Sequence, residues 1–275
     1  MCIRDRNNSI KIRPNPDLIS LKWYCFDVDK IILDIGANSG QFSEYMLKSF
    51  NDVKVIAFEP NLRFEPNFKN LAESYKSRFN YEIKAISEVT GTAQFYFTID
   101  PAQQLSSMLK PNPTGLWDVY SRTFNIKNFK TSNISTCNGE FIKDKYGKKI
   151  YFAKIDVQGT DISVARNLLS DLNIEFLLIE FQASSLENES VYIEQKNSLI
   201  ELSKLITDFD LSTIKLFPNS SYSVEYNVLL CKKNTLSEFD LSFIDLLIES
   251  PILKRFSEIL PIGDVPYLRL SLIHI

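Results

Sequence analysis

The pattern of apolar and polar residues predicts strands that alternate with helices over most of the chain. Short apolar runs predict buried strands at 31–33, 53–58, 81–86, 150–156 and 174–181. Apolar residues at helical spacing predict helices at 39–49, 64–76, 191–206 and from the end of the fourth strand through Leu169. This alternation is typical of a parallel sheet with helices on both faces. We therefore expect an α/β fold.

Two features break the parallel pattern. The last predicted strands, 211–217 and 226–231, are joined by a segment too short for a crossover helix, so they should pair antiparallel. After Gly91, alternating residues at 92–98 predict another antiparallel strand. The stretch 101–129 has weak periodicity, and we expect a long loop there that caps the substrate side.

The C-terminal stretch 236–260 is apolar at helical spacing and contains Pro251, so it predicts two short helices packed on the core. With no repeat or low-complexity linker, we expect a single domain over 7–269. The ends, 1–6 and 270–275, resemble translated sequencing adapters, and we expect them not to be native. That interpretation removes His274, the only histidine, from any catalytic scheme.

Composition narrows the classes of partner. The chain has 275 residues, a net charge of −3 and a pI near 5.4, which argue against a nucleic acid partner. No apolar run is long enough to span a membrane, and the first residues lack the apolar core of a signal peptide. Four scattered cysteines argue against a zinc site or a disulfide framework. We expect a cytoplasmic protein without a metal; the oligomeric state stays open.

The stretch 30–60 predicts a nucleotide-binding unit. It reads as a strand, a turn containing Gly36, Ala37 and Gly40, a helix, and a second strand that ends at Glu59. Glycines allow a ligand to approach the start of a helix, and an acid after the second strand is placed to bind ribose hydroxyls. We therefore expect a ligand that contains adenosine.

Three details select among such ligands. Asn38 stands where a dinucleotide fingerprint has its second glycine, and the turn does not close with the Gly-Lys-Ser/Thr of a P-loop. Asp34 would repel a pyrophosphate but would suit an ammonium group. This combination favours S-adenosylmethionine. A nicotinamide-dependent oxidoreductase and a non-catalytic binding module remain alternatives.

Four acids, Asp34, Glu59, Asp156 and Glu180, follow four apolar runs. Since the carboxyl ends of parallel strands meet at one edge of a sheet, these acids predict a single site there, although each could instead cap a turn. Lys154 shares a face of its strand with Asp156. Beside the adenine we expect the end of the strand at 81–86, with Ala85 and Ile86.

The ordered motifs DIGANSG (34–40), FEP (58–60), KIDVQG (154–159) and IE (179–180) resemble those of the FkbM-type S-adenosylmethionine-dependent methyltransferases. The resemblance covers roughly 30–233. It implies a Rossmann-like seven-stranded methyltransferase sheet, mostly parallel with an antiparallel last strand. It also implies that the cofactor is bound by Asp34, Gly36, Ala37, Asn38, Gly40, Glu59, Pro60, Ala85 and Ile86.

The chain departs from the family pattern at three places. Gln158 and Asp161 stand where the family usually has glutamates, and Cys137-Asn138 stands where it has Leu-Asp. Ser106-Ser107 resembles a serine pair of relatives, which would lie near the acceptor or cap a helix.

The resemblance implies O-methylation of a hydroxyl group on a small molecule or glycan. A hydroxyl acceptor benefits from a general base. Asp156 is the first candidate and Glu180 the second, while Lys154 would orient the acceptor or stabilise an alkoxide.

Overall fold

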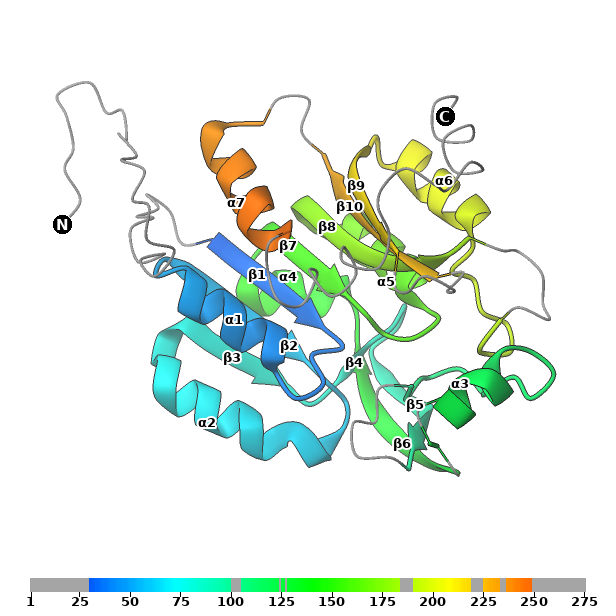
Figure 1. Ribbon diagram of the computed structural model, residues 1–275. Coiled ribbons are helices and arrows are strands. Elements are labelled where there is room, and N and C mark those ends of the chain that lie inside the picture. Colours follow the sequence, from blue (N-terminus) through cyan, green and yellow to red (C-terminus); the bar gives the residue numbers. More distant parts are fainter. Residues whose placement is uncertain are drawn as a thin grey trace, which may run out of the picture.

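The computed structural model describes residues 30–99, 105–123, 125–126, 128–183, 190–218, 225–232 and 236–248. Its centre is a seven-stranded sheet in the order β3-β2-β1-β7-β8-β10-β9 (Figure 1). The strands are β1 Lys30–Ile35, β2 Val53–Phe58, β3 Phe79–Glu82, β7 Lys149–Ile155, β8 Asn173–Gln182, β9 Ser212–Pro218 and β10 Glu225–Cys231. β10 runs antiparallel to β8 and β9, whereas β1, β2, β3, β7 and β8 pair in parallel. The predicted sheet, with an antiparallel last strand, is confirmed.

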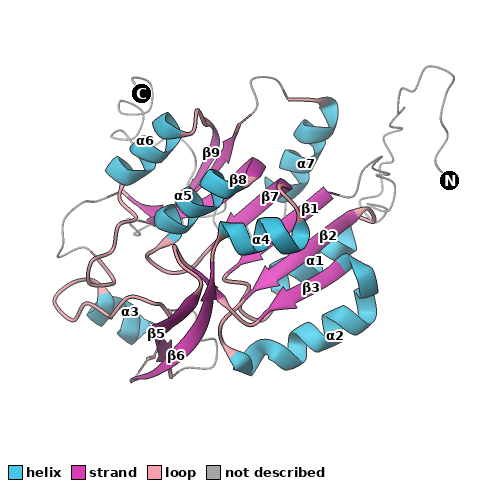
Figure 2. Ribbon diagram, turned by 180° about the vertical axis from the view of Figure 1, so that it is seen from behind, coloured by secondary structure: helices cyan, strands magenta, loops and turns pink. Residues whose placement is uncertain are grey.

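Helices cover both faces of this sheet (Figures 1 and 2). One face carries α1 Gln41–Ser49, α2 Glu65–Tyr75 and α7 Glu238–Ile248, and the other carries α4 Gly139–Tyr146, α5 Asp161–Asp171 and α6 Leu199–Asp208. Neighbouring strand residues point to opposite faces. Ile32 therefore packs in the cluster with Phe42 of α1, and Leu33 packs in the cluster with Ile162 of α5. Burial on both faces explains why β8 is apolar almost throughout.

A second, three-stranded sheet lies beyond the carboxyl ends of β1 and β7 (Figure 1). It contains β4 Ala85–Ile86, β5 Gly91–Thr98 and β6 Phe129–Cys137, in the order β4-β6-β5. The predicted antiparallel strand at 92–98 is confirmed as β5. The single strand predicted at 81–86 is wrong, because the chain bends at Ile83 and residues 85–86 then pair with β6 instead of β2.

Three further segments differ from the prediction. The predicted loop at 101–129 contains α3 Trp117–Thr123. β6 and α4 form where no element was predicted, since β6 has only one apolar residue, Ile134, between its two ends. The helix predicted at 191–206 begins only at Leu199, because the Ser198 side chain accepts a hydrogen bond from the Glu201 N–H and so sets its first turn.

The first predicted C-terminal helix is present as α7, and the second, after Pro251, lies outside the described residues, as do the two chain ends. The 3-10 turns 62–64 and 76–78 flank α2. Within the described ranges, no helix is both long and apolar enough to cross a bilayer.

Candidate functional site

The turn between β1 and α1 is held against two neighbouring strands. Its backbone is left-handed at Gly36, Asn38 and Gly40, with φ of +74°, +50° and +83°. The Gly36 N–H donates to the Phe58 carbonyl oxygen at 2.9 Å, at the end of β2. A Cβ atom on Gly36 would lie 1.9 Å from the carbonyl oxygen of Asp156. The ends of β1, β2 and β7 are therefore fixed together through backbone contacts that leave no room for a side chain at Gly36.

Gly36→Ala is expected to destabilise the protein by more than the backbone cost of about 1–2 kcal/mol for a left-handed alanine, because the turn must also move away from Asp156. Gly40→Ala is the matched control, since Gly40 is also left-handed, with φ of +83° and ψ of +15°, and its Cβ would meet only side-chain atoms, of which the nearest is Leu71 Cδ1 at 2.9 Å. Urea unfolding of both variants measures the difference. Equal losses would show that the contact with Asp156 costs nothing.

Asp34, the last polar residue of β1, faces the protein interior. Its Oδ2 accepts hydrogen bonds from the Ser43 N–H at 3.1 Å and the Ser43 hydroxyl at 2.7 Å, and its side chain has no exposed surface. Its Oδ1 lies 3.6 Å from Lys154 Nζ. Burial raises the pKa of Asp34, although Lys154 and Ser43 oppose the rise. Asp34 thus fixes the first turn of α1 and the position of Lys154.

Lys154 on β7 connects two acids. Its Nζ also lies 3.3 Å from Asp156 Oδ2, and its side chain is 12% exposed. Burial lowers the pKa of Lys154, but Asp156 and Asp34 raise it above the ordinary value. The ammonium group therefore stays charged between the two carboxylates.

Lys154→Met is expected to lower the free energy of unfolding by about 3 kcal/mol, because Asp34 would remain buried without its counter-ion. Lys204→Met, which removes an exposed partner of Glu201, is the control and should cost less than about 1 kcal/mol. Adding Asp34→Asn to Lys154→Met should recover part of the loss. Denaturant unfolding tests this, and equal effects of the two lysine variants would contradict it.

Glu59 follows β2 and lies beside the glycine turn. Its Oε2 accepts a hydrogen bond from the Asn38 N–H and its Oε1 from the Asn61 N–H, both at 2.9 Å. Burial raises the pKa of Glu59 to about 7, although these two donors oppose the shift. The carboxylate thus joins the turn after β1 to the turn after β2.

Three carboxylates gather where β7 and β8 end. Oxygens of Asp156, Asp161 and Glu180 lie within 4.8 Å of one another. The Gln158 side-chain amide donates to Asp156 Oδ1 at 2.9 Å and to Glu180 Oε2 at 3.4 Å. The structure therefore brings together the predicted catalytic residues Asp156, Glu180 and Lys154. Asp161 was not predicted as a member of this cluster.

Asp161 has a structural role within the cluster. Its two oxygens accept hydrogen bonds from the Val157 N–H at 2.9 Å and the Gly159 N–H at 3.1 Å. Burial and then Asp156 raise the pKa of Asp161 to about 6. These bonds fix the turn that follows Asp156, so the aspartate that stands at a family glutamate position shapes this turn.

Gln158 is held from two sides. Its backbone is left-handed, with φ of +60°, and its carbonyl oxygen accepts a hydrogen bond from the Ser107 hydroxyl at 2.6 Å. Its Oε1 lies 3.4 Å from the Tyr192 hydroxyl. Ser107, singled out in the sequence, therefore supports the turn, while the Ser106 hydroxyl accepts a hydrogen bond from the Thr98 N–H at 3.0 Å. Tyr192 was missed, because its segment was predicted as helix.

Cys137-Asn138 retains a capping role. The Asn138 side chain accepts a hydrogen bond from the Phe141 N–H at 3.1 Å and so caps α4. Asparagine caps a helix about as well as aspartate. The Cys137 thiol is buried and forms no disulfide with any residue that the structure describes. The missing aspartate therefore leaves the start of α4 intact.

The predicted cofactor residues fall into two groups. Seven lie in the turns after β1 and β2 or just before them: Asp34, Gly36, Ala37, Asn38, Gly40, Glu59 and Pro60. The other two, Ala85 and Ile86, form β4 and are 8% and 1% exposed. The turn at 36–40 has no basic residue and lies beside Glu59. This donor set fits an ammonium group and a ribose better than a pyrophosphate.

Comparison with known proteins assigns the family. The model of the family described as methyltransferase FkbM domain matches residues 34–213, well over half of the chain. The comparison with curated proteins gave no match. The family match confirms the resemblance read from the motifs, and with it an S-adenosylmethionine-dependent methyltransferase.

Solved structures show only distant likeness. An O-methyltransferase family 2 protein from Planctomyces limnophilus has a TM-score of 0.40 and 15% identity, over 80% of this chain and 52% of that chain, so this chain spans about half of that protein. An S-adenosylmethionine-dependent methyltransferase from Aquifex aeolicus has a TM-score of 0.38 and 13% identity, over 78% and 87%. Fibrillarin from Aeropyrum pernix has a TM-score of 0.41 and 11% identity, over 74% and 66%.

TM-scores this low say nothing about the substrate. The match over 34–213 is of a different kind, because it includes the glycine turn, Glu59, the turn after Asp156, and Glu180 in one ordered series. The chain therefore belongs to the FkbM methyltransferase family.

Proposed function

We propose that this chain transfers a methyl group from S-adenosylmethionine to a hydroxyl group of a small molecule or sugar. The observation that carries the proposal is the convergence of Glu59, Asp156 and Glu180, from three different strand ends, beside the turn at 36–40. In open α/β sheets, ligands bind outside the carboxyl ends of the strands.

The turn at 36–40 would hold the methionine part of the cofactor, with Gly36, Ala37, Asn38 and Gly40 giving close access to the backbone. Glu59 and Pro60 would contact the ribose, and Ala85 and Ile86 would border the adenine. Asp34 is fully buried against Ser43 and Lys154, so we propose that it shapes the methionine end through these two residues.

S-adenosylmethionine supplies a methyl group on a sulfonium, which is a good leaving group. The protein must therefore position the acceptor hydroxyl and accept its proton. Asp156 suits the second task, because its side chain is 42% exposed while Gln158 and Lys154 hold its two oxygens. Glu180 is the alternative base, because the same Gln158 amide donates a hydrogen bond to its Oε2 and so holds it beside Asp156.

Lys154 supports this chemistry through its charge. Its Nζ lies 3.3 Å from Asp156 Oδ2, so the ammonium group holds the carboxylate in place. If the acceptor hydroxyl is bound to Asp156, the same cation would also stabilise negative charge that develops on the acceptor oxygen. We propose a cytoplasmic location on the cysteine pattern of the sequence, whose four cysteines are scattered without a C-x-x-C pair.

The proposal is tested by incubating the full chain with S-adenosylmethionine labelled in its methyl group, together with a panel of sugars and small hydroxyl compounds. We expect label in at least one acceptor and release of S-adenosylhomocysteine. Alkaline hydrolysis and mass spectrometry then distinguish a methyl ether from an N-methyl or ester product. A methylated amine as the sole product would contradict O-methylation.

A further inference from the structure

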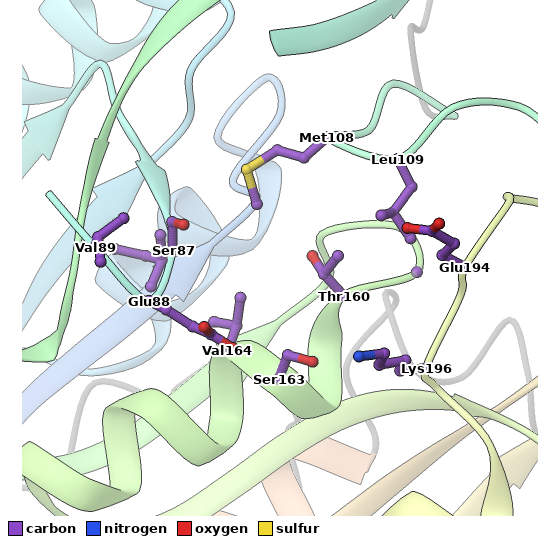
Figure 3. A pocket seen from close by; sticks show the side chains of 12 residues that line it. Ser87, Glu88, Val89, Met108, Leu109, Thr160, Ser163, Val164, Glu194 and Lys196 are labelled. Atoms are coloured by element: carbon purple, nitrogen blue, oxygen red, sulfur yellow. The ribbon is translucent and has the colours of Figure 1, made fainter. Parts of the chain in front are cut away.

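A cavity of about 320 Å³ lies between the loop after β4 and the start of α5 (Figure 3). Its walls come from Ile86 of β4 and residues 87–89 after it, from 108–109, from 159–160 and 163–164 around the start of α5, and from residues 194 and 196. In Figure 3, Met108 reaches into it from above, Ser87 and Val89 lie on the left, and Ser163 and Val164 lie below. This size is near the lower limit of small-molecule sites and suits a ligand of one ring.

The cavity is next to the proposed catalytic turn but separate from the cofactor turns. Gly159 and Thr160 line it, and they directly follow Gln158, whose amide contacts Asp156. Of the residues proposed to hold the cofactor, Ile86 lines it, whereas none of the residues 34–40 or 59–61 does. Much of its wall comes from segments outside the seven-stranded sheet, where acceptor specificity can vary without changing the cofactor turns.

One buried hydroxyl at the cavity, that of Thr160, has no hydrogen-bond partner within the described residues. The hydroxyls of Ser87 and Ser163 also line the cavity. A buried hydroxyl without a partner costs about 1–3 kcal/mol, so a ligand that supplies one is favoured. The other wall is apolar, with Met108, Leu109 and Val164.

Charge at the cavity is weak and mixed. Glu88, Glu194 and Lys196 are exposed residues on its wall, and together they give a net charge of −1. The wall has no cluster of basic residues that would bind a phosphate or a carboxylate. Its single excess negative charge is also too weak to select a strongly cationic ligand. The wall therefore favours a neutral ligand with hydroxyl groups and an apolar C–H surface.

We infer that this cavity binds the methyl acceptor and that the acceptor is a neutral, ring-sized polyhydroxyl compound of the sugar class. The inference rests on the proposed function. A sugar ring presents C–H groups to Met108 and Leu109 while its hydroxyls reach Thr160 and Ser163. The ring then lies beside the turn that carries Asp156.

The probes are methyl glycosides of neutral hexoses and 6-deoxyhexoses, with the glycoside of a hexuronic acid as the charged comparison. Saturation-transfer NMR on the full chain with S-adenosylhomocysteine is expected to detect a neutral glycoside more strongly than the uronic acid. Thr160→Val should weaken that binding about tenfold, whereas Thr160→Ser should retain most of it. Absence of binding by every neutral glycoside, or an unchanged affinity in Thr160→Val, would overturn the inference.

Ser163→Phe fills the cavity, so it distinguishes binding of the acceptor from binding of the cofactor. We expect it to abolish glycoside binding and to leave the affinity for S-adenosylhomocysteine within about twofold, since Ile86 is the only proposed cofactor residue on the cavity wall. Loss of S-adenosylhomocysteine binding by the folded variant would assign the cavity to adenine and overturn the inference. If the wild-type protein binds S-adenosylhomocysteine but no glycoside, this inference is contradicted and the proposed function is not. If it binds a glycoside but not S-adenosylhomocysteine, both the methyltransferase function and the acceptor role are contradicted.

Discussion

Asp156→Asn is expected to lower the rate of methyl transfer by a factor of about 10²–10⁴, the usual contribution of a general base. The amide has nearly the shape of the carboxylate but does not take up the acceptor proton. Because we assign Asp156, which follows β7, to the acceptor and Glu59 to the cofactor, the affinity for S-adenosylhomocysteine should change little. The rate is measured at saturating cofactor with an acceptor that the wild-type protein methylates.

Two controls make this result specific. Asp144→Asn changes an exposed aspartate on α4 and should leave the rate unchanged. Glu180→Gln should give a smaller loss than Asp156→Asn if Glu180 only supports the cluster through Gln158. Full turnover by Asp156→Asn would remove Asp156 as the base, and a larger loss in Glu180→Gln would transfer the role to Glu180.

Replacing Glu59 should have a comparably large effect on cofactor binding, and this effect should depend on pH. The ionised carboxylate is the form that accepts hydrogen bonds from ribose hydroxyls, and burial raises its pKa to about 7. The affinity for S-adenosylhomocysteine should therefore fall about tenfold between about pH 8 and pH 6. Glu59→Gln should bind about 100-fold more weakly at about pH 8 and lose this pH dependence. Calorimetric titration at both pH values measures these affinities. The same pH dependence in the wild-type protein and in Glu59→Gln would contradict the role of Glu59.

The same shift predicts the pH dependence of stability. The folded protein keeps the Glu59 proton up to about pH 7, whereas the unfolded chain loses it near the ordinary pKa of 4.5. Between pH 4.5 and about 7 the folded state thus binds more protons than the unfolded state. The free energy of unfolding therefore falls as the pH rises over this range, and Glu59 alone accounts for a decrease of about 3 kcal/mol. In Glu59→Gln this contribution should be absent, as urea unfolding across this range will show.

The large sheet could be predicted because its strands are buried on both faces, so runs such as 53–58 and 174–181 are mostly apolar. The three-stranded sheet left a weaker signal. β6 is polar along most of its length and pairs with β5 through its backbone, and the two-residue β4 is too short to leave a pattern. The late start of α6 depends on the cap at Ser198 and on tertiary contacts of Tyr192, which spacing alone does not show.

The order of the strands was enough to predict that the acids gather at one edge of the sheet. It was not enough to predict which residues each acid contacts. Asp34 was assigned to a ligand ammonium group, and in the structure Lys154 provides an ammonium group from within the chain. The bridge from Gln158 to Asp156 and Glu180 depends on a left-handed backbone at a residue that is not glycine, for which the sequence has no signal. The roles of these residues in catalysis and cofactor binding stay predictions.

The central claim is that the turn at 36–40 and Glu59 hold S-adenosylmethionine. Its most direct test is calorimetric titration of the wild-type protein with S-adenosylhomocysteine and with NAD, beside Glu59→Ala. We predict that the wild-type protein binds S-adenosylhomocysteine and not NAD, and that Glu59→Ala loses this binding while it remains folded. Binding of NAD alone, or unchanged binding in Glu59→Ala, would contradict the account.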